Sequence, residues 1–510
     1  MTLSHADDRQ APKNQTLPGQ APAATGLTRE ILALAVVVVL GSVMTILDAT
    51  IVNVALPTLG QDLHTSIATI QWVPTIYLLA FASVIPLTGW VSGRFGAKPV
   101  WLASLGLFMA GSLLAGLSPS IGALIGARVV QGLGGGMIMP LGQSMLAQAA
   151  GPKRMGRVMS IVAVPMLLAP VFGPLIGGAL IGETLIGETL IGAASWRWIF
   201  FVNLPVGLLA IVLAVRLLPA GGRRAAQRLD VPGVVVLSGG LALFLYGLAE
   251  TGQHAQVATP SALGPMAAGA VAVALFAWRA LRVPNPLIDL RLFRQRGFAT
   301  GTAVNLVLGV ALFGVALLLP LYFELLRGRT PVQTGLLLTP QGLGAAVTIS
   351  LAGYLTDKAG ARRVVPVGVL LAVAGTAWYT QIGVHTPYWA LLGALFLIGA
   401  GLGATITPAM AAAYQGLPAT AMGQATAAIS VVQRVAGALG SALLAVILQQ
   451  ATTARLPGFR GGIGQAGQLA ATSPHAAAAL ADAFGVSFAV ALAICVLALI
   501  PTALIPHREA

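Results

Sequence analysis

The chain contains fourteen stretches of predominantly apolar residues separated by short polar segments. A helix needs about 20 apolar residues to cross the hydrocarbon core of a bilayer, so each stretch predicts a transmembrane helix. Composition agrees: 57% of the residues are hydrophobic and 8% are charged, whereas soluble domains carry about 25% charged residues. The predicted fold class is therefore an all-α polytopic membrane protein. The predicted spans are 31–56, 70–92, 100–118, 121–147, 157–181, 198–218, 231–250, 262–281, 298–322, 333–356, 364–382, 388–408, 421–448 and 484–505.

The distribution of basic residues predicts the orientation. An even number of spans places both ends of the chain on one side, and 21 of the 28 Lys and Arg residues fall on that side. Short cytoplasmic loops of bacterial inner-membrane proteins hold the excess of Lys and Arg. Both termini are therefore predicted to be cytoplasmic, in a bacterial inner membrane. The net charge of +14 is a topology signal and gives no reason to expect nucleic acid as a partner. Two basic residues lie within spans, and five lie in loops on the outer side of the membrane: Arg197, Arg327, Arg329, Arg455 and Arg460.

Three sequence similarities recur at nearly one spacing. GWVSGRFGAKP begins at Gly89, and GYLTDKAGARR begins at Gly353, 264 positions later. Two further pairs, GGGMIMP with GLGATITP and MGRVMSIV with MGQATAAI, are 268 and 267 positions apart. Internal symmetry of this kind is common in transporters. The repeat predicts a cytoplasmic tail (1–30), a six-helix bundle (31–218), a linker with two peripheral inserted helices (219–297), a second six-helix bundle (298–505) and a short cytoplasmic tail (506–510).

The segments between spans differ in length. The longest predicted loop is 449–483, on the outer side. The segment 282–297 on the cytoplasmic side is a candidate for an interfacial helix. No intrachain disulfide can form, because Cys495 is the one cysteine.

Six motifs together carry a resemblance to a known family. They are LDATIVNVALP at 47–57, basic turns at 89–98 and 353–363, RVVQGLGGG at 128–136, GPLIGG at 173–178 and WRWIFFVNLP at 196–205. In this combination the chain resembles the 14-helix drug:proton antiporter branch of the major facilitator superfamily, along essentially its whole length. The resemblance implies the major facilitator fold, with two six-helix bundles plus the two inserted helices.

The resemblance also implies roles for two groups of residues. The basic turns would be gating loops, and the fifth-span motif would seal helix contacts against leak. Gly93 replaces the family's acid in the first loop and Ala97 its base, whereas Asp357 is kept in the second, so an acid-based latch would operate in one loop only. Ala169 and Val162 stand where the fifth-span motif usually has further glycines. The implied gating residues are Gly89, Gly93, Arg94, Gly96, Lys98, Gly353, Asp357, Lys358, Gly360, Arg362 and Arg363, and the implied antiporter-motif residues are Gly173, Pro174, Gly177 and Gly178.

Two opposite charges lie at the same predicted depth. Asp48 is nine residues from the outer end of the first span, and Arg128 is eight residues from the outer end of the fourth. At 1.5 Å per residue these depths are about 13 and 12 Å. Charged side chains rarely face lipid, so both are predicted to face the bundle interior and to approach each other. Two interpretations stay open: a proton-coupling site, in which burial favours the protonated carboxyl and the arginine favours its ionised form, and a fixed structural pair between two helices.

Three further polar residues are candidates for a substrate cavity: Asn53, Gln131 and Arg434. Gln131 follows Arg128 at i+3 on the same helix face. Arg434 lies deep in the thirteenth span and either lines the cavity or reaches outward. Asn53 is about 140° from Asp48 around the helix and is assigned to hydrogen bonding near the outer end. If both arginines faced the cavity, two bases would oppose one acid, which favours a neutral, amphipathic or anionic substrate over a dication.

Other features predict neither catalysis nor a cofactor. The Gly-rich strings lack the Lys-Ser/Thr of a P-loop and lie within spans, so transport must draw on a gradient. The six histidines show no metal-ligand spacing, and no nucleophile–base arrangement is visible. Glu250 and Glu324, at outer span ends, are interpreted as solvated rim residues, and LIGETLIGETLIG at 180–192 as a five-residue duplication.

The sequence thus predicts a proton-driven exporter of small hydrophobic or amphipathic compounds that works by alternating access. A proton-coupled or facilitative importer of a small metabolite is the nearest alternative. A non-transporting sensor or scaffold is a more distant one, because no loop exceeds about 35 residues. The predicted partners are a small-molecule substrate, protons and the lipid bilayer, for a monomeric protein. A periplasmic adaptor with an outer-membrane channel stays open, and no metal or cofactor is expected.

Overall fold

The computed structural model describes residues 28–150, 155–181, 196–218, 228–254, 259–418, 421–456, 459 and 461–506. Within these ranges the chain is helical and contains no strand. Thirteen helices in the described ranges are long and apolar enough to cross a membrane. A further helix, α7 (Met155–Ile181), covers the predicted fifth span. The predicted all-α polytopic membrane fold is confirmed.

The N-terminal half of the structure consists of helices α1 to α10. The second predicted span is one run of three elements, broken at Pro86 by a short 3-10 helix. The sixth is divided at Val202. The elements are α1 (Arg29–Asp62), α2 (Ile67–Ile70), α3 (Trp72–Val84), η1 (Ile85–Leu87), α4 (Thr88–Phe95), α5 (Ala97–Gly116), α6 (Ile121–Ala150), α7 (Met155–Ile181), α9 (Trp198–Phe201) and α10 (Asn203–Leu217).

Two inserted helices separate this half from the C-terminal half. They are α11 (Val231–His254) and α12 (Pro260–Ala280). The candidate interfacial segment forms only a short 3-10 helix, η2 (Leu290–Arg294). The C-terminal half contains α13 (Arg296–Leu321), η3 (Tyr322–Leu326), α14 (Pro331–Ala359), α15 (Ala361–Tyr379), α16 (Tyr388–Tyr414), α17 (Met422–Arg455), α18 (Ile463–Thr472), α19 (Pro474–Leu497) and α20 (Leu499–Ala503).

The prediction of a long outer loop at 449–483 is wrong. Helix α17 continues to Arg455, α18 forms within the segment, and α19 begins at Pro474. Alanine, which has the highest helix propensity, is abundant here. The Ser473 hydroxyl accepts a hydrogen bond from the backbone N–H of Ala476 at 3.4 Å and so caps α19.

The two basic turns have the same backbone shape. Helices α4 and α5 meet at Gly96, with φ 92°, and α14 and α15 meet at Gly360, with φ 82°. Only glycine adopts such positive φ values without strain. The repeat seen in the sequence therefore has the same sharp turn at equivalent places in both halves.

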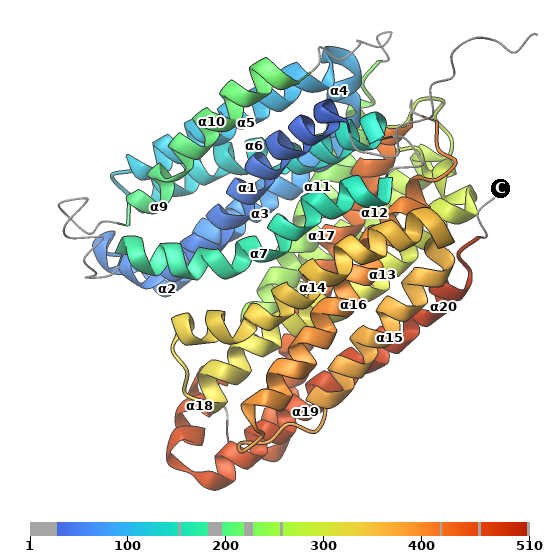
Figure 1. Cartoon of the computed structure of the whole chain (residues 1–510). Helices are drawn as coiled ribbons and strands as arrows, with labels where there is room; N and C mark the ends of the chain where they lie inside the picture. Colours follow the sequence, from blue (N-terminus) through green and yellow to red (C-terminus); the bar gives the residue numbers. More distant parts are fainter. Residues whose placement is uncertain are drawn as a thin grey trace, which may run out of the picture.

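The two halves join on the side where the described chain begins and ends. One apolar core on this side takes residues from both halves, for example Val38 and Trp101 with Phe298 and Tyr414. Toward the opposite side the cores are separate, one around Phe200 in the N-terminal half and another confined to the C-terminal half. Figure 1 shows the blue-to-green and the yellow-to-red helices diverging away from the C-terminal end. The halves are therefore closed on the terminal side and parted on the other.

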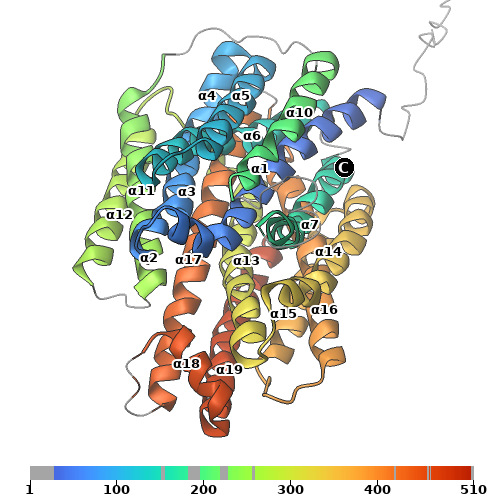
Figure 2. The same ribbon diagram turned by 90° about the vertical axis from the view of Figure 1, so that its left-hand side faces the viewer.

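The inserted helices lie against the seam between the halves. Helix α12 packs mainly on α11, while α11 contacts both α3 and α17 (Figure 2). Trp72 on α3 stacks on Tyr246 of α11 with ring centroids 5.7 Å apart. Helix α11 thus bridges the two halves, and α12 packs mainly on α11.

Candidate functional site

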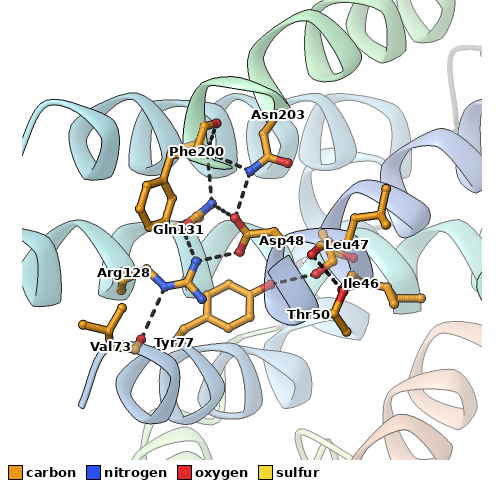
Figure 3. Close-up of polar contacts among 12 residues, drawn as sticks. Ile46, Leu47, Asp48, Thr50, Val73, Tyr77, Arg128, Gln131, Phe200 and Asn203 are labelled. Carbon is orange, nitrogen blue, oxygen red and sulfur yellow. Dashed lines mark hydrogen bonds and ion pairs between the residues drawn. The ribbon is translucent and has the colours of Figure 1, made fainter. Parts of the chain in front are cut away.

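A buried ion pair lies inside the N-terminal half. Asp48 on α1 and Arg128 on α6 are both 0% exposed. Arg128 Nη1 donates a hydrogen bond to Asp48 Oδ2 at 2.6 Å (Figure 3). The approach predicted from matching depths is therefore present in the structure.

Two amide side chains complete the shell around the carboxylate. Gln131 Nε2 and Asn203 Nδ2 each donate to Asp48 Oδ1 at 2.8 Å. The same two nitrogens reach Ser112 Oγ at 3.2 and 3.0 Å, and Ser112 in turn donates to the backbone oxygen of Phe200 at 2.9 Å. Three donors, Arg128 and Gln131 from α6 and Asn203 from α10, thus surround the two carboxyl oxygens of Asp48.

The guanidinium of Arg128 has further partners besides Asp48. Its Nη1 also donates to Gln131 Oε1 at 2.6 Å, and its Nε donates to the backbone oxygen of Val73 at 3.3 Å. The Arg128 Cζ atom lies 4.0 Å from the centroid of the Tyr77 ring, a cation–π geometry. Removing one partner of such a buried pair leaves an uncompensated charge, which costs about 3–5 kcal/mol.

Aromatic rings connect this pair to the C-terminal half. The Tyr77 and Phe81 rings on α3 have centroids 5.9 Å apart. The Arg434 guanidinium of α17 lies 4.2 Å from the centroid of the Phe81 ring. Arg434 therefore points across the seam toward α3, and it is not among the residues that line the cavity described next.

A cavity of about 740 Å³ lies between the halves. Its volume is in the range of sites for drug-sized ligands. Helix α1 supplies Thr50 and Asn53, and the remaining described lining comes from the C-terminal half. Gln131 is absent from this lining, because it is buried against Asp48. The lining from the C-terminal half includes Asn305, Leu308, Leu312, Phe313, Glu324, Leu338, Gln341, Leu402, Thr405 and Gln433.

Sequence comparisons place the chain in a family. The model of the Major Facilitator Superfamily matches residues 38–441. The chain belongs to the Major Facilitator Superfamily. It is a transporter and not an enzyme.

The relatives of this transporter agree with the antiporter branch that its motifs indicated. A "Multidrug resistance protein B homolog" of Mycobacterium tuberculosis is 38% identical, over 98% of this chain and 94% of the relative. A puromycin resistance protein of Streptomyces alboniger is 33% identical over 82% of each chain. Among solved structures, a proton:xylose symporter bound to 6-bromo-6-deoxy-D-glucose matches with a TM-score of 0.60 at 15% identity, over 91% of this chain and 94% of that one. This last similarity shows a shared fold.

The first basic turn of the transporter lies where the halves meet. A Cβ atom at Gly89 would lie 3.2 Å from the backbone carbon of Gly423, at the start of α17. The Lys98 Nζ atom donates to the backbone oxygens of Val215 and Leu218 at 2.8 and 2.7 Å, which ties α5 to the end of α10. Gly93, where the family has an acid, borders a second cavity of about 330 Å³ beside Arg94, and Gly96 is the positive-φ residue described above.

The second basic turn differs in what its side chains contact. The Lys358 Nζ atom lies 4.5 Å from the centroid of the Tyr354 ring. Arg362 and Arg363 are exposed and Gly353 is buried. The side chain of Asp357, on which the predicted latch depends, lies outside the described side chains.

The fifth-span motif lies where α7 crosses α1. A side chain at Gly173 would overlap the Cβ atom of Thr50, which would lie 2.6 Å from the added carbon. Gly177 is also buried. The side-chain surroundings of Pro174 and Gly178 and the repeated LIGET segment after Ile181 lie outside the described parts. The close approach of α7 to α1 agrees with a packing role for Gly173.

Two members of the buried network are not among the site residues that the sequence predicts. Asn203 lies within a motif of the sixth span, and Ser112 lies in an apolar run. Both are polar residues inside transmembrane stretches, which is a signal that such a group meets another polar group in the bundle.

Proposed function

We propose that this transporter exports small apolar or amphipathic compounds in exchange for protons, by alternating access of the two halves. The names of the relatives, which include multidrug and puromycin resistance, support export of drug-like compounds. The size and apolar lining of the cavity support substrates of the same kind.

One observation carries the proposal: α1 serves both the ion pair and the cavity. Asp48 faces the interior of the N-terminal half, while Thr50 and Asn53 on the same helix line the cavity. A two-residue step rotates a side chain by about 200° around a helix, so opposite faces of α1 do these two tasks. A change at Asp48 can therefore alter the cavity wall through the position of α1.

Protonation of Asp48 is the change we propose. A neutral carboxyl loses its attraction to Arg128 and keeps weaker hydrogen bonds to Gln131 and Asn203. The contacts that hold α1 against α6 and α10 are then weaker, and α1 can shift relative to them.

The remaining sequence-based assignments belong to the same proposal. The excess of Lys and Arg on the terminal side supports cytoplasmic termini in a bacterial inner membrane, so the parted side faces outward. The two basic turns would act as gates, with Gly89 at the closed contact, and α7 would seal against α1. Transport is proposed for the monomer, and an adaptor protein is not required by any step.

Inside-out membrane vesicles test the proposal. Vesicles that contain the protein and are energised with an acidic lumen should accumulate puromycin or an apolar dye, and a protonophore should abolish the accumulation. Vesicles without the protein are the control. Accumulation that persists after the pH gradient is collapsed would show that protons do not drive the transport.

A further inference from the structure

An arginine of the C-terminal half points across the seam into the N-terminal half: Arg434 on α17. It is partly exposed, and no hydrogen bond or ion pair of Arg434 occurs within the described residues. Its guanidinium carbon lies 4.2 Å from the centroid of the Phe81 ring on α3. A charge inside the membrane is costly without a partner, so the face of this ring is the support that the described structure gives to Arg434.

Neither of the two deep arginines lines the described part of the cavity. Arg128 is fully buried in its pair with Asp48, and Arg434 faces Phe81. The condition that two bases face the cavity is therefore not met, and the substrate preference that depended on it has no support. The position of Arg434 indicates a role at the seam between the halves instead.

Two buried rings on α3 connect Arg434 with the ion pair. The Phe81 ring centroid lies 5.9 Å from that of Tyr77. On the far side of Tyr77, the Arg128 Cζ atom lies 4.0 Å from the ring centroid (Figure 3). Because Arg128 is bonded to Asp48, contacts run without interruption from α17 to the carboxylate on α1.

Glycines of α6 fix the backbone at both rings. A Cβ atom at Gly132 would lie 2.6 Å from the backbone oxygen of Tyr77, and one at Gly136 would overlap the backbone oxygen of Phe81. The two glycines are four residues apart, as are the two aromatic residues, so the same faces of α3 and α6 meet at both levels. Since no gap separates the helices there, a movement of the Arg128 guanidinium is passed on to the ring side chains.

From this chain of contacts we infer that Arg434 is a positioning residue that makes closure of the terminal side depend on the ion pair. An ionised Asp48 holds Arg128 over Tyr77, and the neighbouring Phe81 ring then supports Arg434. A neutral Asp48 attracts Arg128 less strongly, so the guanidinium and the rings can move and Arg434 loses its support.

The consequence lies in the packing of α17. This helix packs on η1, α4 and α6 of the N-terminal half, and Arg434 adds a contact with α3. When that contact is lost, the terminal side is held less firmly and parts more readily. The inference rests on the proposed function for the protonation of Asp48 and for alternating access.

Distances between two spin labels test the inference without a substrate or a gradient. The labels are attached to Pro99→Cys at the start of α5 and to Gln415→Cys after α16, which are exposed positions in different halves on the terminal side. The full-length protein is held in lipid nanodiscs at one pH, with its one native cysteine replaced by Cys495→Ser. The distance distribution gives the ratio of parted to closed protein.

Three variants at fixed pH measure the effect of the Arg434 charge. Arg434→Met should raise the ratio of parted to closed protein by about threefold or more. It removes an unpaired charge and leaves no partner uncompensated, so folding is retained. Arg434→Lys keeps a cation that can lie over the ring and should preserve most of the closed form. Arg282→Met is the control, because it removes a similar contact, 4.1 Å from the Trp278 ring centroid, beyond the end of α12.

The variant Asp48→Asn decides whether the ion pair acts through Arg434. It should part the terminal side by itself, and Arg434→Met should then change the ratio by less than about twofold, because two changes in one chain of contacts are not additive. A full further effect of Arg434→Met would overturn the inference, since Arg434 would then be an independent contact between the halves. An unchanged ratio in either single variant, or an equal change in Arg282→Met, would overturn it as well.

The vesicle experiment separates this inference from the proposed function. Failure of export, with the expected pattern of distances intact, would reject the proposed function alone. Proton-driven export by a protein whose distances do not respond to Arg434→Met would reject the inference alone.

Discussion

The two halves of the transporter differ in where charged side chains are buried and in where a cavity lies. In the N-terminal half, Asp48 and Arg128 are fully buried and bonded to each other, and Gln131 and Asn203 also donate to the carboxylate. The C-terminal half supplies most of the cavity and, within the described lining, one charge. The offsets of 264 to 268 that relate the halves place the counterpart of Asp48 within residues 312–316, LFGVA, where Leu312 and Phe313 line the cavity. Two repeats of one architecture thus hold a buried ion pair in one half and supply most of a cavity in the other.

This difference suggests how a proton-coupling site and a substrate-binding site can be separated within one transporter. An ion pair in a bundle core is shielded from substrates, so the cavity can accept varied apolar compounds without disturbing it. Helix α1 is the physical connection, because it carries Asp48 on one face and Thr50 and Asn53 on the other. Variants that change the ion pair or the cavity one at a time test whether the two regions are as separate as this geometry indicates.

The largest expected effect comes from Asp48→Asn. The variant cannot take up and release a proton at this position, so proton-driven accumulation in vesicles should fall to the level of empty vesicles. Binding of an apolar dye to the purified protein should stay within about twofold, because Asp48 does not line the cavity. Unchanged accumulation with unchanged proton flux would make the ion pair a fixed structural contact.

Arg128→Met should lower the stability of the protein strongly. It leaves the Asp48 carboxylate buried without its cation, and the cost is about 3–5 kcal/mol. Thermal unfolding in detergent, followed by loss of the monodisperse peak, measures it. The double variant Asp48→Asn with Arg128→Met removes both charges and should recover most of the stability while export stays absent. Recovery of export in the double variant would contradict a coupling role for the pair.

Filling the cavity should weaken ligand binding and leave the stability of the protein unchanged. Leu338→Trp adds volume to the cavity wall of the C-terminal half, away from the ion pair. Dye binding should weaken by roughly tenfold, which corresponds to about 1.4 kcal/mol, while the unfolding temperature stays near that of the parent. A matched Leu→Trp change at Leu336, which is exposed on the same helix and does not line this cavity, should leave binding unaltered.

The smallest effect is expected from Phe81→Leu. The change removes the ring that Arg434 contacts across the seam, a cation–π contact worth about 0.5–2 kcal/mol. Export should slow by a few fold, with dye binding and the Asp48–Arg128 pair intact. Export at the parent rate would show that the aromatic link between the halves has no part in transport.

The sequence by itself determined the spans, the repeat and the pairing of the two deep charges. Long apolar runs can only be buried in lipid or in other helices, and a charge among them needs a partner of opposite sign. Asp48 and Arg128 could therefore be paired from depth alone. The family motifs also located Gly89 and Gly96, whose close contact and positive φ the structure then explained.

Only the tertiary structure decided which face of each helix meets the cavity. A transmembrane helix such as α1 is apolar on nearly every side, so periodicity gives no signal about the direction in which one polar residue points. For that reason the sequence predicts Gln131 and Arg434 in the cavity, whereas the places of Asn203 and Ser112 were decided by contacts between helices far apart in the chain. Depth along a helix follows from counting residues, whereas rotation about its axis is set by packing against its neighbours.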